Sequence, residues 1–246
     1  MLPKEIKSLQ HPFVKKIVKL RKEKDFRKNE KLVFVMGKKV VSEISKRITP
    51  TTLLITNSNI TLDITAEKIL ITKQIMNKIA GINTTEEVAA LFPMPAEKPI
   101  SNEKSILVVD KVSDPGNLGT LFRSALALNF NAIVLIHGTV DPFNDKAIRA
   151  SKGACFLLPF CYETENSFYQ LMKEKKITGY LADMDGADIK KVKFKTPFAL
   201  ILSNEAKGKQ EWPQDFISIA IPMNKDVESL NVATSGSILM YVMKNA

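Results

Sequence analysis

The sequence predicts an α/β protein with a mostly parallel sheet covered by helices on both faces. In the carboxy-terminal half, short and nearly continuous apolar runs alternate with segments of helical spacing. Such runs are typical of parallel strands that are buried on both faces. Glycine, amide and carboxylate residues gather where several of these runs end. Because ligands of such sheets bind beyond the carboxyl ends of the strands, these ends are the first candidates for a site.

The carboxy-terminal half is expected to form six strands followed by a final helix from Leu230 to Lys244. The strands are predicted over Ile106–Val109, Ala132–Ile136, Cys155–Phe160, Thr178–Ala182, Phe198–Leu202 and Ile217–Ile221.

The amino-terminal part predicts a smaller α/β layer domain. Phe13, Ile17 and Leu20 recur at helical spacing, so residues 12 to 28 are expected to form one amphipathic helix with a basic polar face. The elements that follow are strands at Leu32–Met36, Thr51–Thr56, Ile69–Ile71 and Val88–Phe92, and helices at Lys38–Arg47 and Lys73–Ala80.

A proline-rich stretch separates the two parts. Pro93, Pro95 and Pro99 restrict the backbone and disfavour regular structure. We therefore expect a basic domain over 1–92, a linker over 93–104 and a second domain over 105–246.

The net charge of +10 lies in the first fifth of the chain. Residues 1–50 hold 15 Lys and Arg against 5 Asp and Glu, whereas the remaining residues hold 21 of each. Clustered basic side chains favour an RNA partner, because binding to phosphates releases counterions. A solvated helix face that aids solubility is the simpler alternative. A transit peptide is a third reading, against which Glu23, Asp25 and Glu30 argue.

The composition and motifs argue against several other classes of protein. Cys155 and Cys161 are too few for a disulfide framework and have no neighbouring histidine to complete a metal site. No apolar run approaches the roughly 18 to 20 residues of a membrane span. We expect a cytoplasmic protein with neither a metal nor a membrane partner. A nucleotide-binding enzyme of another kind is disfavoured, because the glycine-rich phosphate loops are missing.

Three segments carry the chemistry. They are Asp110–Ala125 with the run Asp-Pro-Gly-Asn-Leu-Gly, Leu202–Gly208, and Ile221–Met223 continuing to Val227–Val232. Each also has a plain structural reading, in which Asp114 caps a helix, Glu205 serves a turn, and Ser229 or Asn231 caps the last helix.

Together the three segments resemble the three motifs of the SpoU branch of the SPOUT RNA methyltransferases. The resemblance implies a carboxy-terminal trefoil knot, a homodimer, S-adenosylmethionine as cofactor and an amino-terminal ribosomal-protein-like RNA-binding domain. It implies 2'-O-methylation of a ribose in structured RNA, with rRNA favoured over tRNA.

The resemblance also implies site residues by position. The expected active-site residues are Arg123, Asn117, Glu205, Ser229 and Asn231. The expected cofactor-binding residues are Leu202, Ser203, Gly208, Ile221, Met223 and Leu230. Arginine is a poor proton acceptor, so Arg123 is assigned to binding phosphate and stabilising alkoxide charge.

The chain departs from the family pattern at four positions. Ser203, Ala206 and Lys225 stand where the family has glycine, and Met36 stands where an acidic residue usually precedes Gly37. A non-glycine residue held at positive φ costs about 1–2 kcal/mol, which would weaken cofactor binding. The alternative function is therefore a non-catalytic RNA-binding or ribosome-assembly factor on the same fold.

Overall fold

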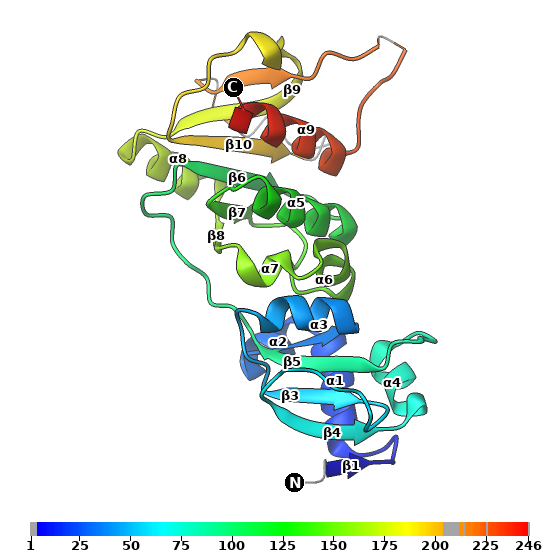
Figure 1. The fold of residues 1–246 in the computed structure, drawn as a ribbon. Coiled ribbons are helices and arrows are strands. Elements are labelled where there is room, and N and C mark those ends of the chain that lie inside the picture. The colour runs from blue at the N-terminus through cyan, green and yellow to red at the C-terminus, as the bar shows by residue number, and fades with distance from the viewer. Residues whose placement is uncertain (1–3, 204–211, 214, 225, 246) are drawn as a thin grey trace. The chain divides into compact units, whose positions relative to one another are not determined.

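The computed structural model describes residues 4–203, 212–213, 215–224 and 226–245. The chain divides into two compact units. One comprises Met1–Ala96 with Phe143–Leu157, and the other comprises Glu97–Pro142 with Leu158–Ala246. Figure 1 shows the elements of both units, each with a sheet flanked by helices. No helix among the described residues is both long and apolar enough to span a bilayer.

The first unit is built on a five-stranded mixed sheet with the strand order β1-β4-β3-β5-β2. Strands β1, β4 and β3 pair in parallel, whereas β5 is antiparallel to both β3 and β2. Its elements are β1 (Lys4–Ile6), α1 (Pro12–Lys22), α2 (Lys24–Glu30), β2 (Leu32–Met36), α3 (Lys38–Ser45), β3 (Thr52–Ile55), β4 (Glu67–Ile71), α4 (Lys73–Ala80), β5 (Val88–Pro93), α6 (Asp145–Ser151) and α7 (Ala154–Leu157).

The predicted helix over residues 12 to 28 is in fact two helices. Glu23 has extended backbone between α1 and α2. Arg27 is 3% exposed, and its guanidinium donates hydrogen bonds to the carbonyl oxygens of Leu20 at 2.7 Å and Arg21 at 3.0 Å. The free carbonyls at the end of α1 are thus satisfied by a side chain from α2, a pairing that helical periodicity does not reveal.

The second unit has a six-stranded sheet with the order β11-β9-β10-β6-β7-β8, and every strand pair is parallel. Its elements are β6 (Ser105–Asp110), α5 (Pro115–Ala127), β7 (Ala132–Ile136), β8 (Phe160–Glu163), α8 (Glu165–Glu174), β9 (Thr178–Asp188), the short 3-10 helix η1 (Ile189–Lys191), β10 (Phe198–Ser203), β11 (Ile217–Ala220) and α9 (Val232–Asn245). The predicted α/β class and parallel sheet are confirmed.

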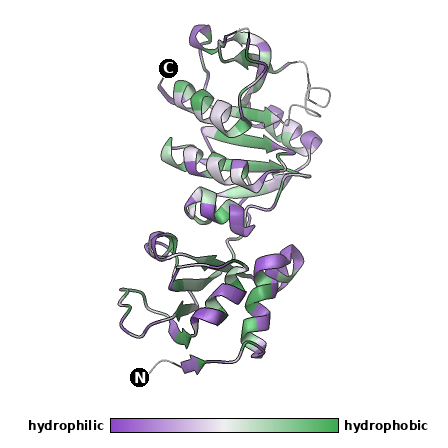
Figure 2. Ribbon diagram, turned by 90° about the vertical axis from the view of Figure 1, so that its right-hand side faces the viewer, coloured by the Kyte–Doolittle hydropathy of each residue, from purple (hydrophilic) through white to green (hydrophobic). Residues whose placement is uncertain are grey.

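Both faces of this sheet are covered. Val108 of β6 and Ile201 of β10 belong to one buried cluster with Phe168 and Met172 of α8. On the other face α5 and α9 lie side by side (Figure 1). The approach of α9 depends on Gly236, because a Cβ there would lie 2.5 Å from a methyl carbon of Leu202. Apolar residues are accordingly concentrated on the strands in Figure 2.

The strand predicted over Cys155–Phe160 is wrong. The chain forms α7 and then β8, which begins only at Phe160. Lys152 and Gly153 both have positive φ and set the turn into α7. A short apolar run fits a buried helix as well as a strand, so periodicity could not separate them.

The division into units also differs from the predicted domains. The break at Ala96 falls within the predicted linker, but residues 143–157 group with the amino-terminal part. The ring of Phe156 packs edge-on against Phe92 at 5.7 Å. A Cβ on Gly153 would lie 2.7 Å from a side-chain carbon of Ile44. This segment is therefore part of the first unit's core although it lies far along the sequence.

Candidate active site

The three sequence segments begin at one edge of the second sheet. Strands β6 and β10 are parallel neighbours, with Asp110 paired to Ser203 at their carboxyl ends. Strand β11 runs in the same direction on the far side of β9. Because all strands are parallel, segments that are about 90 and 110 residues apart start at the same edge.

In the first segment the chain passes from β6 into α5 through a capped helix start. Asp114 Oδ1 accepts a hydrogen bond from the backbone N–H of Asn117 at 2.8 Å. Pro115 is the first helical residue, a position that suits proline because its missing N–H would have no partner there. The capping role of Asp114 is thus confirmed, and the cap places Asn117 in the first turn of α5.

In the third segment Asn231 has two roles. Its Oδ1 accepts from the backbone N–H of Ala233 at 2.9 Å, which caps α9. Its Nδ2 donates to Asn117 Oδ1 at 3.0 Å. Two predicted active-site residues from opposite ends of the domain are therefore in direct contact, and the capping alternative for Asn231 holds as well.

A cavity of about 440 Å³ lies beyond the strand ends. Its wall combines residues from β10 with the segment between β11 and α9. Six of the predicted site residues line it: Leu202, Ser203, Ile221, Met223, Ser229 and Leu230.

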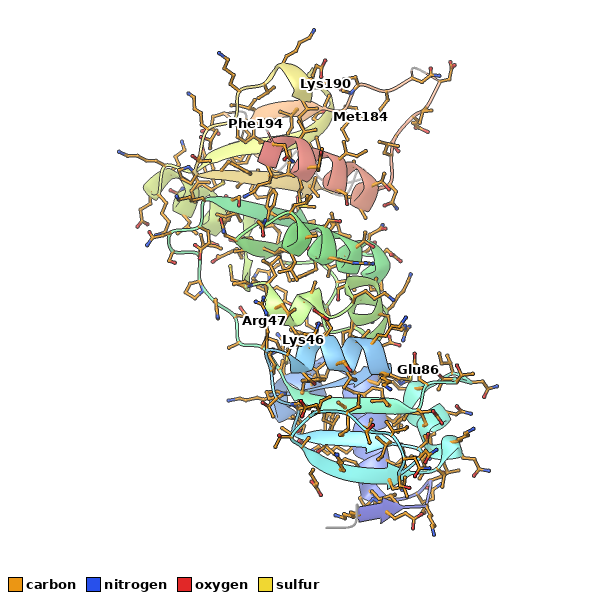
Figure 3. The ribbon with its side chains drawn as sticks, viewed as in Figure 1. Lys46, Arg47, Glu86, Met184, Lys190 and Phe194 are labelled. Atoms are coloured by element: carbon orange, nitrogen blue, oxygen red, sulfur yellow. The ribbon has the colours of Figure 1, made fainter. Side chains whose placement is uncertain are left out.

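The cavity has further lining residues that the sequence reasoning missed. They are Ala182, Asp183, Met184, Ile219, Glu228, Val232, Ser235 and Leu239. Met184 is 56% exposed (Figure 3) and belongs to β9, which runs to Asp188 instead of ending at Ala182 as predicted. In the sequence the run Asp-Met-Asp-Gly comes directly after the apolar part of this strand, so the rule that pointed to the other strand ends applied here too.

The remaining predicted site residues do not line the cavity among the described residues. Arg123 is exposed on α5, and its guanidinium makes no hydrogen bond or ion pair with another described residue. Glu205, Ala206, Gly208 and Lys225 lie outside the described residues.

The expected backbone strain at Ser203 is absent. Ser203 is the last residue of β10 and is not among the described non-glycine residues with positive φ. Its hydroxyl donates to Asp110 Oδ2 at 3.1 Å. Burial raises the pKa of the Asp110 carboxyl, and hydrogen bonds from Trp212 and Ser203 partly oppose the shift.

The chain is similar to known proteins over the part that holds this site. The model of the SpoU rRNA methylase family matches residues 104–241. The chain is 32% identical over 178 residues to the Bacillus subtilis 23S rRNA (guanosine(2553)-2'-O)-methyltransferase RlmP, which covers 71% of each chain.

Two crystal structures share the fold. The rRNA methyltransferase from Sinorhizobium meliloti has a TM-score of 0.86 at 23% identity, covering 98% of this chain and 97% of that one. The SpoU methyltransferase AviRb from Streptomyces viridochromogenes, in complex with AdoMet, has a TM-score of 0.85 at 21% identity and covers 96% and 98%.

The matched region spans β6 to α9 and thus contains all three segments, the Asn117–Asn231 contact and the cavity. The chain belongs to the SpoU rRNA methylase family.

Proposed function

We propose that the protein transfers a methyl group from S-adenosylmethionine to a ribose 2'-hydroxyl of structured RNA, with rRNA as the substrate. The observation that carries this proposal is the cavity at the strand ends, with the contact between Asn117 and Asn231 joining the first and third motifs. Family membership and the 23S rRNA named for the Bacillus relative support the reaction and the substrate class.

The cavity suits the cofactor in size and chemistry. Its volume of about 440 Å³ lies within the range of roughly 300–1,000 Å³ that is usual for small-molecule sites. Leu202, Ile221 and Leu230 provide apolar wall for an adenine ring. The carboxylates of Asp183 and Glu228 suit a cofactor that carries positive charge. When bound, S-adenosylmethionine supplies a methyl group activated by its sulfonium.

The residues of this chain would position the hydroxyl and stabilise its charge. Arg123 would hold an RNA phosphate and the developing alkoxide, while its own proton stays bound. Asn117, Asn231 and Ser229 would orient the ribose with hydrogen bonds. We assign Glu205 to orienting the ribose or Arg123, and Gly208 to the cofactor site. The 2'-oxygen would bond to the methyl carbon as the bond from that carbon to sulfur breaks, leaving S-adenosylhomocysteine, and the hydroxyl proton would pass to solvent.

We further propose that the amino-terminal domain binds RNA and that the active protein is a cytoplasmic homodimer whose carboxy-terminal domain is knotted. The family resemblance supports the knot and the dimer. Ile238 and Tyr241 support a dimer as well, because they lie one turn apart on α9 and are 38% and 60% exposed. A tRNA substrate is the alternative within this function.

A non-catalytic RNA-binding factor is the second candidate. This hypothesis rests on the three replaced glycines. Ser203 does not support it, because the Ser203 backbone is not at positive φ. Saturable binding of S-adenosylmethionine in calorimetric titration, lost in Leu230→Arg, supports the enzyme. No binding to folded wild-type protein would favour the factor.

The assignment of Arg123 is tested by Arg123→Ala. We expect methylation of RNA to fall about 100- to 1,000-fold, the usual loss when one stabilising donor is removed, while cofactor affinity is kept. Arg123→Lys is the matched control, because it keeps the charge without the planar fork. A wild-type rate in Arg123→Ala would defeat the assignment.

A further inference from the structure

Asp110, the last residue of β6, is a buried carboxylate to which the function above gives no role. Its side chain is 0% exposed. Its Oδ2 accepts two hydrogen bonds, from Trp212 Nε1 at 2.8 Å and from Ser203 Oγ at 3.1 Å. Its Oδ1 is buried and has no hydrogen-bond partner among the described residues. Burying a carboxylate with one oxygen unpaired costs free energy of folding, so such a group is usually kept for a structural or functional role.

The backbone around Asp110 is held firmly. Strand β6 lies between β10 and β7 in the middle of the sheet. The Thr139 hydroxyl donates to the carbonyl oxygen of Val109 at 3.0 Å and accepts from the backbone N–H of Lys111 at 3.0 Å. One side chain therefore braces the residues on both sides of Asp110. The carboxylate is a rigid point to which other segments are attached.

The two donors to Asp110 stand on either side of residues 204–211. Ser203 ends β10 and lines the cofactor cavity. Trp212 is 6% exposed, and its ring packs against Phe216 at 5.6 Å. The span between these donors contains Glu205 and Gly208. A single carboxylate oxygen thus ties Ser203 and Trp212 to β6, the strand from which the first motif starts.

We propose that Asp110 is a positioning residue for the cofactor cavity. Its carboxylate holds Ser203 and Trp212 in place before the cofactor binds. The inference rests on the proposed function, because the ligand whose binding it assists is S-adenosylmethionine. Groups that are held in their binding geometry beforehand lose less conformational freedom on association, so removing the carboxylate weakens binding.

The test compares Asp110→Leu with Asp110→Asn by calorimetric titration with S-adenosylmethionine. Leucine cannot accept either hydrogen bond, so we expect affinity to fall about tenfold, because side chains that were held beforehand must then be ordered on binding. Asparagine keeps an oxygen that accepts from Trp212 and Ser203, so its affinity stays within about threefold of wild type. Trp212 is the only tryptophan in the chain, so its emission reports on the surroundings of its hydrogen bond to Asp110.

Asn131→Ala is the matched structural control. Asn131 Oδ1 accepts from the backbone N–H groups of Lys104 at 3.2 Å and Ser105 at 3.0 Å, at the opposite end of β6. This variant is expected to unfold at lower temperature but to bind the cofactor like wild type. Equal weakening in Asn131→Ala and Asp110→Leu would overturn the proposal, as would unchanged affinity in a folded Asp110→Leu protein. If wild type itself fails to bind, the proposed function fails first.

If Asp110→Leu does not fold, Ser203→Ala, Trp212→Phe and the double variant replace it. Each single variant removes one of the two hydrogen bonds to Asp110. If the two bonds hold Ser203 and Trp212 as one clamp, the loss of either bond already weakens the other, so the double variant binds about as weakly as the single variant with the lower affinity. Losses that simply multiply would show two independent contacts and reject the clamp.

Discussion

Ser203 ends β10 in extended backbone, and its hydroxyl donates to a buried carboxylate. Glycine could not make this bond, so the replacement of the family's glycine adds a contact at no conformational cost.

Glu86 offers a similar lesson (Figure 3). Its Oε2 accepts from the backbone N–H of Lys38 at 3.2 Å, at the start of α3. A carboxylate from far along the chain thus lies beside Gly37, where Met36 leaves the usual acidic residue missing.

At the same scale, Asp110 should make stability depend on pH. Burial raises the pKa of its carboxyl above the ordinary value of 3.8. The folded protein therefore binds this proton more tightly than the unfolded chain does. The resulting contribution to the free energy of unfolding is fully present below pH 3.8 and is lost as the pH rises through the raised pKa. Asparagine does not titrate. We expect the free energy of unfolding of Asp110→Asn to improve relative to wild type as the pH rises.

Urea unfolding of both proteins between about pH 4 and about pH 8 measures this difference. Lys111 and Glu165 also act on the Asp110 charge, and both are present in each protein. A difference that stays constant across the range would show that the Asp110 carboxyl has the same pKa in both states.

At the scale of elements, α1 separates an apolar and a basic face. Val14, Ile17 and Leu20 are buried in the first unit's core. Lys15, Lys19 and Lys22 are exposed and recur at intervals of four and three residues, so they share one face. Such a row is suited to a phosphate backbone, whereas the sheet beneath it positions the helix.

Replacing Lys15, Lys19 and Lys22 together by Gln tests this face. We expect weaker RNA binding and a smaller dependence of affinity on salt, with the log–log slope reduced by roughly 0.7 to 0.9 for each lost phosphate contact. Filter binding over a series of salt concentrations measures it. Lys190, Lys191 and Lys193, which are exposed in the second unit, serve as the control triple. A larger effect from the control would move the RNA footprint away from α1.

At the scale of the whole molecule, the two units are interleaved in sequence. Residues 143–157 leave the second unit and join the first before the chain returns at Leu158. Each unit is thus made of two chain segments, and a cut at the proline-rich linker would not separate them. Domain borders read from composition mark the linker but not this return.

The proposed dimer makes a prediction at this scale. Tyr241→Glu introduces a charge on the exposed face of α9, where burial against a second copy would be costly. We expect the protein to shift from dimer to monomer in light scattering after gel filtration, with its thermal unfolding little changed. Ile82→Glu is the control, because Ile82 is similarly exposed, at 55%, in the first unit. A monomeric wild type would reject the dimer outright.

The sequence by itself determined the fold class, most strands and the strand ends that carry the site. Local patterns suffice there, because a buried parallel strand must be apolar and the turn after it must supply glycine, caps and polar groups. The helix from Lys73 to Ala80, which stops at Gly81 with φ 73°, shows how far such local signals reach.

Only the tertiary structure decided the features that depend on contacts between residues far apart in the sequence. These are the contact of Asn117 with Asn231, the clamp of Ser203 and Trp212 on Asp110, the break before α2 and the return of α7 to the first unit. Each depends on which hydrogen-bond donor or apolar surface a folded neighbour presents. Sequence periodicity indicates only whether a residue is buried. The folded structure determines which residues it packs against or forms hydrogen bonds with.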